Sequence, residues 1–239
     1  MNVKAIDFSN VRYGYVPEKD VLKGIDLSVE QSTITAILGK SGSGKSTLLQ
    51  IINGMIRPGE GEVRLHGRPV DYADLYALRL QIGYVVQHIG LFPHMTIFQN
   101  ISILGRVIKK PKRQVESRVK QLIDMVQLPA IYLGKYPHEL SGGEQQRAGI
   151  CRALLLKPPV LLMDEPFASL DNDTKRGIYH HLLDIQKKEN RTVVLVTHDW
   201  EETAALADNF IWIEDGKVKA TGGKADLVKL KDDYFSTGG

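Results

Sequence analysis

The sequence predicts an α/β fold: a core with a mostly parallel sheet, an N-terminal antiparallel β subdomain and a helical subdomain inserted at about residues 88–157. Short β-branched apolar runs alternate with helix-like segments, which is typical of α/β domains. The first thirty residues instead alternate apolar with polar side chains, and no strand-like run occurs between Gln87 and Pro158. Because no long linker divides the 239 residues, we expect one domain over residues 1–239.

Four short runs that are apolar on both faces predict the central strands. They cover residues 33–38, 82–86, 160–163 and 192–196. A strand with two apolar faces needs helices on both sides, so we expect all four in the middle of the parallel sheet.

The other elements follow from alternation, helical spacing and turn residues. Residues 3–8, 25–29 and 62–65 alternate like half-exposed strands, whereas residues 111–127 and 141–156 have apolar residues at helical spacing. Residues 209–213 and 217–220 flank Glu214, Asp215 and Gly216, a turn sequence that favours a β-hairpin.

The composition excludes several classes of protein. With 43% hydrophobic and 25% charged residues the chain resembles an ordinary globular domain, and its net charge of +3 is too small to indicate nucleic acid as a partner. Its one cysteine, Cys151, has no disulfide partner and is expected in the core. Without a signal peptide or an apolar run long enough to cross a bilayer, a reducing, cytoplasmic location is expected.

A glycine-rich motif between the first central strand and a helix predicts a phosphate site. Gly39, Lys40, Ser41, Gly42, Ser43, Gly44, Lys45 and Ser46 fit G-x-x-x-x-G-K-[ST], and Thr47 continues the motif. Glycines let backbone N–H groups face phosphate oxygens, Lys45 reaches the β and γ phosphates, and Ser46 offers a hydroxyl to Mg²⁺. The core is therefore expected to be of the P-loop NTPase type.

Two carboxylates follow a buried strand, where an open α/β sheet binds its ligands. Asp164 is expected to hold Mg²⁺ through water, and Glu165 to polarise the water that attacks the γ phosphate. A second anion site is indicated at Ser141, Gly142, Gly143 and Glu144. Ser141 and Glu144 form a capping box, but capping does not require two glycines in the first turn of a helix.

These motifs together resemble the ATP-binding subunits of ABC transporters over nearly the whole chain. Residues 140–146 resemble the signature motif and residues 168–171, which end in Asp171, resemble the D-loop. Gln87 resembles the Q-loop glutamine that contacts the metal, and His198 resembles the switch histidine. The resemblance also implies an aromatic residue that stacks on the base. Tyr13 is preferred, and Tyr15 is the alternative because residues 16–20 resemble a short insertion, which makes the position of the stacking residue relative to the family pattern ambiguous.

The resemblance implies a head-to-tail homodimer that holds ATP between one phosphate loop and the partner's signature motif. Residues 82–97 resemble importer ATPases of the glycine betaine, choline and carnitine family, which implies a permease partner, an indirectly acting substrate-binding protein and a place on the inner face of the membrane. Other ABC ATPases, including amino acid importers, lipoprotein-release systems, exporters and an iron-sulfur assembly scaffold, remain alternatives.

The segment after Gln87 has more apolar residues than a surface loop requires. Ile89, Leu91, Phe92, Met95 and Ile97 either line a groove for a helix of the permease or pack inside the helical subdomain. The chain also departs from the family pattern at His88, at Lys40 and at Ala168 with Ser169.

Overall fold

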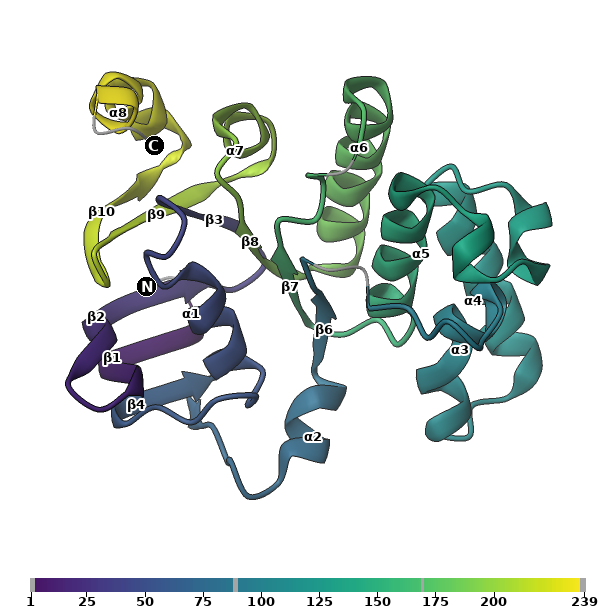
Figure 1. Ribbon diagram of the computed structural model, residues 1–239, viewed down its shortest axis with the longest axis horizontal. Coiled ribbons are helices and arrows are strands. Elements are labelled where there is room, and N and C mark those ends of the chain that lie inside the picture. Colours follow the sequence, from purple (N-terminus) through teal and green to yellow (C-terminus); the bar gives the residue numbers. More distant parts are fainter. Residues whose placement is uncertain (1–2, 88–89, 169, 237–239) are drawn as a thin grey trace.

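The computed structural model describes residues 3–87, 90–168 and 170–236, and it confirms an α/β core (Figure 1). The central sheet has the strand order β10-β9-β3-β8-β7-β6. Its strands are β3 (Ile34–Leu38), β6 (Ile82–Val85), β7 (Val160–Asp164), β8 (Thr192–Val196), β9 (Asn209–Glu214) and β10 (Lys217–Gly223). All neighbours from β9 to β6 pair in parallel, whereas β10 is antiparallel to β9.

One of the four predicted central strands lies elsewhere. Every residue of β3, β7 and β8 is buried, as their two apolar faces predict. In contrast β6 forms an edge of the sheet. Its residues are still mostly buried because helices α2 (Leu75–Leu80) and α5 (Gly142–Leu154) pack against it, so apolar composition alone did not distinguish an edge from the centre.

The N-terminal strands form a separate antiparallel sheet, as predicted. Its order is β2-β1-β4-β5, from β1 (Lys4–Val16), β2 (Lys19–Glu30), β4 (Glu60–Leu65) and β5 (Arg68–Pro69). Helix α1 (Lys45–Ile52) starts at the phosphate loop and buries Leu48 and Leu49 in the same core as Ile6 and Leu22. The antiparallel sheet therefore supports the helix that begins at the predicted phosphate site.

Three helices gather at the end of the molecule opposite the antiparallel sheet (Figure 1). They are α3 (Ile97–Val107), α4 (Lys112–Met125) and α5, with 3₁₀ turns at Ala130–Gly134 and Pro137–Glu139 between α4 and α5. Val119, Leu122 and Cys151 are buried between them, which confirms the interior position of the cysteine. In the described ranges no helix combines the length and the hydropathy needed to cross a membrane.

The C-terminal part completes the core with α6 (Asn172–Glu189), α7 (Trp200–Leu206) and α8 (Lys224–Ser236). The sequence patterns did not predict these helices, nor α2 and α3. The predicted hairpin is confirmed, because Asp215 (φ 48°) and Gly216 (φ 76°) both have the left-handed conformation of a tight hairpin turn.

Candidate active site

The phosphate loop has backbone conformations that only glycine adopts without strain. Gly44, at the start of α1, has φ 104°, and a Cβ there would lie 2.7 Å from Cδ2 of Leu22. Gly39 has φ 151°, and a Cβ there would clash with the carbonyl oxygen of Ile213. These two positions explain why glycine begins the loop and precedes the helix.

Lys45 lies inside the loop and stabilises it through hydrogen bonds. Its Nζ donates to the carbonyl oxygens of Gly39 and Lys40, each at 2.7 Å, and the residue is 6% exposed. Burial lowers the pKa of Lys45, while the charges of Glu165 and Asp164 oppose that shift. The loop thus carries a desolvated cation at its centre, which suits a polyphosphate.

Ser46 and Asp164 bring two oxygen donors together beneath the loop. Oγ of Ser46 donates to Oδ1 of Asp164 at 3.1 Å, which joins the start of α1 to the end of β7. Asp164 is 4% exposed, and burial together with the charge of Asp164 raises the pKa of Tyr84. Mg²⁺ prefers oxygen ligands and keeps several waters, so a hydroxyl and a carboxylate beside a phosphate loop fit it.

Glu165 has a backbone conformation unusual for its residue type. Its φ is 44°, and its N–H donates to the carbonyl oxygen of Val196 at 2.9 Å. Its Oε2 accepts from Nε2 of Gln87 at 3.2 Å, and its Oε1 lies 3.4 Å from Nδ1 of His198. Among the predicted catalytic residues, Glu165 therefore contacts both Gln87 and His198.

A pocket of about 290 Å³ opens beside this group. It is lined by Tyr15, Val21, Ser41, Gly42, Gly44, Lys45, Ser46, Thr47, Gln87 and Glu165. Gly39, Lys40 and Ser43 belong to the same loop but do not line the pocket; the first two hold Lys45 through their carbonyl groups.

The structure separates the two candidate aromatics. Tyr15 lines the pocket, is 58% exposed, and its hydroxyl lies 3.1 Å from both Oγ1 of Thr47 and Oε1 of Gln50. Tyr13 packs against the core of the antiparallel sheet and contacts Tyr15 edge-on, with ring centroids 5.1 Å apart. This geometry favours Tyr15 over the preferred Tyr13 as the stacking residue.

A second cluster, absent from the sequence predictions, adjoins His198. Nζ of Lys175 lies 2.8 Å from Oε1 of Glu202 and 3.4 Å from Oδ2 of Asp199, and Thr197 donates to Oε2 of Glu202 at 2.7 Å. These residues share a pocket of about 220 Å³ with Glu165 and His198. The cluster connects α6 to the segment that carries the histidine, and no local sequence pattern shows such a pairing.

The signature residues form the predicted capping box at the start of α5. The N–H of Ser141 donates to Oε2 of Glu144 at 2.8 Å, and the N–H of Glu144 donates to Oγ of Ser141 at 3.4 Å. A Cβ on Gly142 would meet nothing within 4 Å, so the backbone there is open to an approaching group. None of residues 141–144 is among the residues that line the phosphate-loop pocket of the same chain.

Asp171, the residue predicted in the D-loop, caps α6. Its carboxylate accepts from the N–H of Thr174 at 2.9 Å, and the Thr174 hydrogen bonds lower the pKa of Asp171.

The apolar stretch after Gln87 is partly buried and partly exposed. Ile97 is fully buried and Leu91 packs against the same core, whereas Phe92 is 41% exposed. Packing inside the helical subdomain thus explains the apolar side chains of Leu91 and Ile97 but not that of Phe92, which lies on the surface. His88, Ile89 and Ser169 lie outside the described residues.

A phosphate loop after one strand of a parallel sheet, with an aspartate and a glutamate at the end of another strand of that sheet, defines a P-loop nucleotide-binding protein. A model of the ABC transporter family matches residues 22–168, more than half of the chain. The chain belongs to the ABC transporter family.

Curated relatives include importer subunits. The chain is 40% identical over 221 residues to the glycine betaine/carnitine/choline transport ATP-binding protein OpuCA of Bacillus subtilis (92% of this chain, 58% of the relative). It is 41% identical over 235 residues to the osmoprotectant import ATP-binding protein OsmV of Salmonella typhimurium (96% and 62%). The chain thus spans less than two thirds of the length of these two relatives.

Solved structures confirm the fold. The dimeric structure of MJ0796, a bacterial ABC transporter cassette, matches with a TM-score of 0.85 at 32% identity, covering 92% of this chain and 98% of the other. The structure of cbiO1 from Clostridium perfringens, part of the ABC transporter complex cbiONQ, matches with a TM-score of 0.86 at 30% identity, covering 98% and 93%.

Proposed function

We propose that this chain hydrolyses ATP with Mg²⁺ and so drives solute import through a separate permease. The observation that carries the proposal is the contact of Glu165 with Gln87 and His198 beside the phosphate-loop pocket. A carboxylate held between an amide donor and an imidazole, next to a buried lysine, is the arrangement that water attack on a terminal phosphate requires.

Each residue has a distinct task in this proposal. Lys45 and the loop amides bind the β and γ phosphates, and Tyr15 stacks on the base from the rim of the pocket. Ser46, Asp164 and Gln87 would hold Mg²⁺, and the bound ion would supply positive charge beside the phosphate oxygens. Glu165 orients and polarises the water, and His198 donates a hydrogen bond to the γ phosphate.

The proposed site is completed by a second subunit. Residues 141–144 lie outside the chain's own pocket, and the open backbone at Gly142 suits the approach of a phosphate from another chain. A related cassette has a dimeric structure. We infer a head-to-tail pair in which Ser141, Gly142 and Gly143 of one chain close the nucleotide site of the other, with Asp171 of the D-loop at the interface.

The proposed transported solute is a quaternary amine or a similar osmoprotectant. The proposal of import is based on the relatives OpuCA and OsmV, whose names state transport of such compounds. The permease would bind at the surface that includes the exposed Phe92, and a substrate-binding protein would act through the permease. The chain would then work in the cytoplasm, on the inner face of the membrane.

The shared site is tested with two inactive variants. Gly142→Asp places a carboxylate against the partner's γ phosphate, where like charges in a dry cleft repel strongly. Because a side chain at position 142 has open space, this variant should fold, bind ATP through its own loop and fail to dimerise or hydrolyse. Lys45→Ala should fail because it loses the charge that meets the β and γ phosphates.

Mixing the two variants gives heterodimers with one intact site and one doubly damaged site, so ATPase activity should return. The control is a chain with both substitutions, which should rescue neither parent. A Gly142→Asp monomer that cannot bind ATP would place the signature motif in its own subunit's pocket and overturn the shared-site model. Absence of hydrolysis in every mixture and in the wild-type chain would overturn the activity itself.

A further inference from the structure

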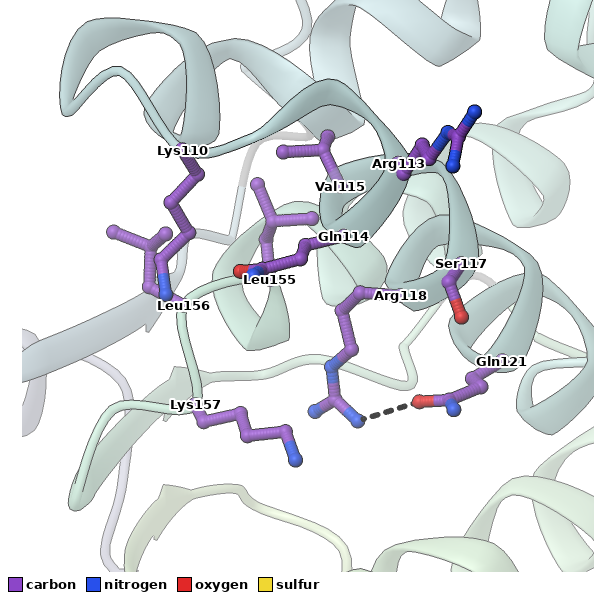
Figure 2. Close-up of a pocket in the computed structure, with 10 residues that line it drawn as sticks. All are labelled: Lys110, Arg113, Gln114, Val115, Ser117, Arg118, Gln121, Leu155, Leu156 and Lys157. Carbon is purple, nitrogen blue, oxygen red and sulfur yellow. Dashed lines mark hydrogen bonds between the residues drawn. The ribbon is translucent and has the colours of Figure 1, made fainter.

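A pocket of about 400 Å³ lies in the helical subdomain, between α4 and the segment that joins α5 to β7 (Figure 2). Ten residues line it, of which four are cationic and none is acidic: Lys110, Arg113, Arg118 and Lys157 supply the charge. The volume falls within the range of sites that bind small molecules. Because the whole chain has a net charge of only +3, this is a local concentration of positive charge.

Arg118 is the best fixed of the four cations. Its side chain is 13% exposed, and its Nη2 donates to the carbonyl oxygen of Leu154 at 3.2 Å. Its Nη1 lies 3.5 Å from Oε1 of Gln121, while its Nε is buried and has no hydrogen-bond partner in the described part of the chain. The guanidinium therefore holds a fixed positive charge at the wall of the pocket.

The carboxylate that contacts two of the lining cations, that of Glu189, is shared among several cations. Oε1 of Glu189 lies 3.5 Å from Arg118 and 3.7 Å from Lys157, while Oε2 accepts from Nε of Arg191 at 2.7 Å. Burial lowers the pKa of Arg118, and the charge of Arg191 adds to that effect against the opposing charge of Glu189. One carboxylate therefore faces three cations, and the group keeps an excess of positive charge.

Two further observations point to an anion. Among the described residues none forms an ion pair with Lys110 or Arg113. Helix α4 begins with Lys112 and Arg113, has no acidic residue in its first turn and no side-chain cap. Cations at a helix N-terminus oppose the helix dipole, so helix stability does not explain this placement.

We propose that this pocket binds a phosphate-bearing anion, which Lys110, Arg118, Lys157 and the amide of Gln114 hold. Figure 2 shows the polar ends of these four side chains arranged along the pocket, while Arg113 extends away from them. Val115 and Leu155 give the pocket an apolar wall, so the ligand has room for an organic part as large as a nucleoside. The site is separate from the phosphate loop and does not depend on ATP hydrolysis.

The position of the pocket would allow a bound ligand to influence the ATP site through the elements that the two sites share. Lys157 lies three residues before β7, whose other end carries Asp164, and Leu155 follows the helix whose first residue is Gly142. Arg118 and Lys157 both contact Glu189 at the end of α6, so an anion that draws them into the pocket competes with this link between the helical subdomain and the core. Occupancy should therefore alter the ATPase rate.

The site is tested by anomalous diffraction from crystals soaked in tungstate, an analogue of phosphate. We expect one peak at the phosphate loop, which serves as the internal reference, and a second between Lys110, Arg118 and Lys157. In Lys110→Gln/Lys157→Gln, whose substituted side chains are exposed, only the second peak should disappear. Lys120→Gln, an exposed change on the same helix outside the pocket, should keep both. A wild-type crystal with tungstate at the phosphate loop alone overturns the proposal.

Calorimetry with tripolyphosphate supplies the solution test. Wild-type protein should bind at two sites, and the double variant should bind at the pocket at least about tenfold more weakly, since hydrogen bonds to charged groups are worth more than this factor. If the wild-type protein binds tripolyphosphate at one site only, and Lys45→Ala removes that site, the proposal is contradicted. Flotation with phosphatidylglycerol vesicles then identifies the source of the phosphate: binding that the double variant loses indicates a lipid headgroup, and equal binding indicates a free anion.

Discussion

The ion pair between Lys175 and Glu202 allows a quantitative test of the cluster beside His198. The exposed fractions of the two side chains are 15% and 4%, and their charged atoms are 2.8 Å apart. Lys175→Met leaves the Glu202 carboxylate buried without its cationic partner, with the hydroxyls of Thr197 and Tyr179 still hydrogen-bonded to it. Removing one partner of a buried pair typically costs about 3–5 kcal/mol, and we expect about 3 kcal/mol because Lys175 keeps some contact with water.

Urea unfolding of four chains measures this value: wild type, Lys175→Met, Lys175→Met/Glu202→Gln, and Lys188→Met as the control. The double variant should recover at least half of the lost free energy of unfolding because no charge remains buried alone. Lys188 is 76% exposed and lies 3.9 Å from Asp184 on the same helix, so its loss should change the free energy by less than about 0.5 kcal/mol. A Lys175→Met chain as stable as the control would refute the reasoning.

The same pair predicts a pH dependence. Burial acts to lower the pKa of Lys175, but the hydrogen bond and charge of Glu202, with the charge of Asp199, raise it above its ordinary value of 10.5. A raised pKa in the folded state stabilises the protein below the pKa of the unfolded lysine, and this contribution disappears as the pH rises through the folded pKa. The difference between wild type and Lys175→Met should therefore shrink in alkaline solution.

Substitutions at three positions test the proposed ATP site and the surface beside it. Glu165→Gln keeps the hydrogen bond from Gln87 but removes the charge that polarises water, so ATP hydrolysis should fall by roughly 10²–10⁴ while ATP binding survives; turnover near that of the wild type would contradict the assignment. Tyr15→Ala should weaken binding of all purine nucleotides by roughly 1–3 kcal/mol in calorimetry, whereas the same loss with Tyr13→Ala alone would show that the register is wrong. Phe92→Ser should reduce co-purification with the permease without changing the ATPase activity of the isolated chain, and equal recovery would exclude this surface as the contact.

Elements with local causes could be predicted from the sequence. The phosphate loop depends on glycines and a lysine within eight residues, and the hairpin at Asp215 and Gly216 depends on two residues with positive φ. In contrast, the apolar run of β6 fits an edge strand covered by α2 and α5 as well as it fits a central strand. The choice between them depends on packing across the chain, which the local pattern does not contain.

The two tyrosines show how a local irregularity limits such predictions. Strand β1 shifts register against β2 between Tyr13 and Gly14 and again between Gly14 and Val16, and only two residues separate the strands. Register shifts break the alternation from which the facing side of a residue is predicted. The sequence therefore left two candidates for the proposed stacking residue, and of these two the structure has Tyr15, and not Tyr13, in the lining of the pocket.

Contacts between residues far apart in the sequence could not be predicted from local patterns either. Lys175 meets Glu202, and Arg118 meets Glu189, across sequence separations that no spacing rule covers. Glu165 also has a left-handed backbone, a conformation that costs a non-glycine residue roughly 1–3 kcal/mol. The hydrogen bond from its N–H to Val196 holds that conformation, and the resulting turn directs the carboxylate to Gln87 and His198. A helical or extended residue at this position would aim its side chain elsewhere, so the strain is retained where the proposed chemistry needs the carboxylate.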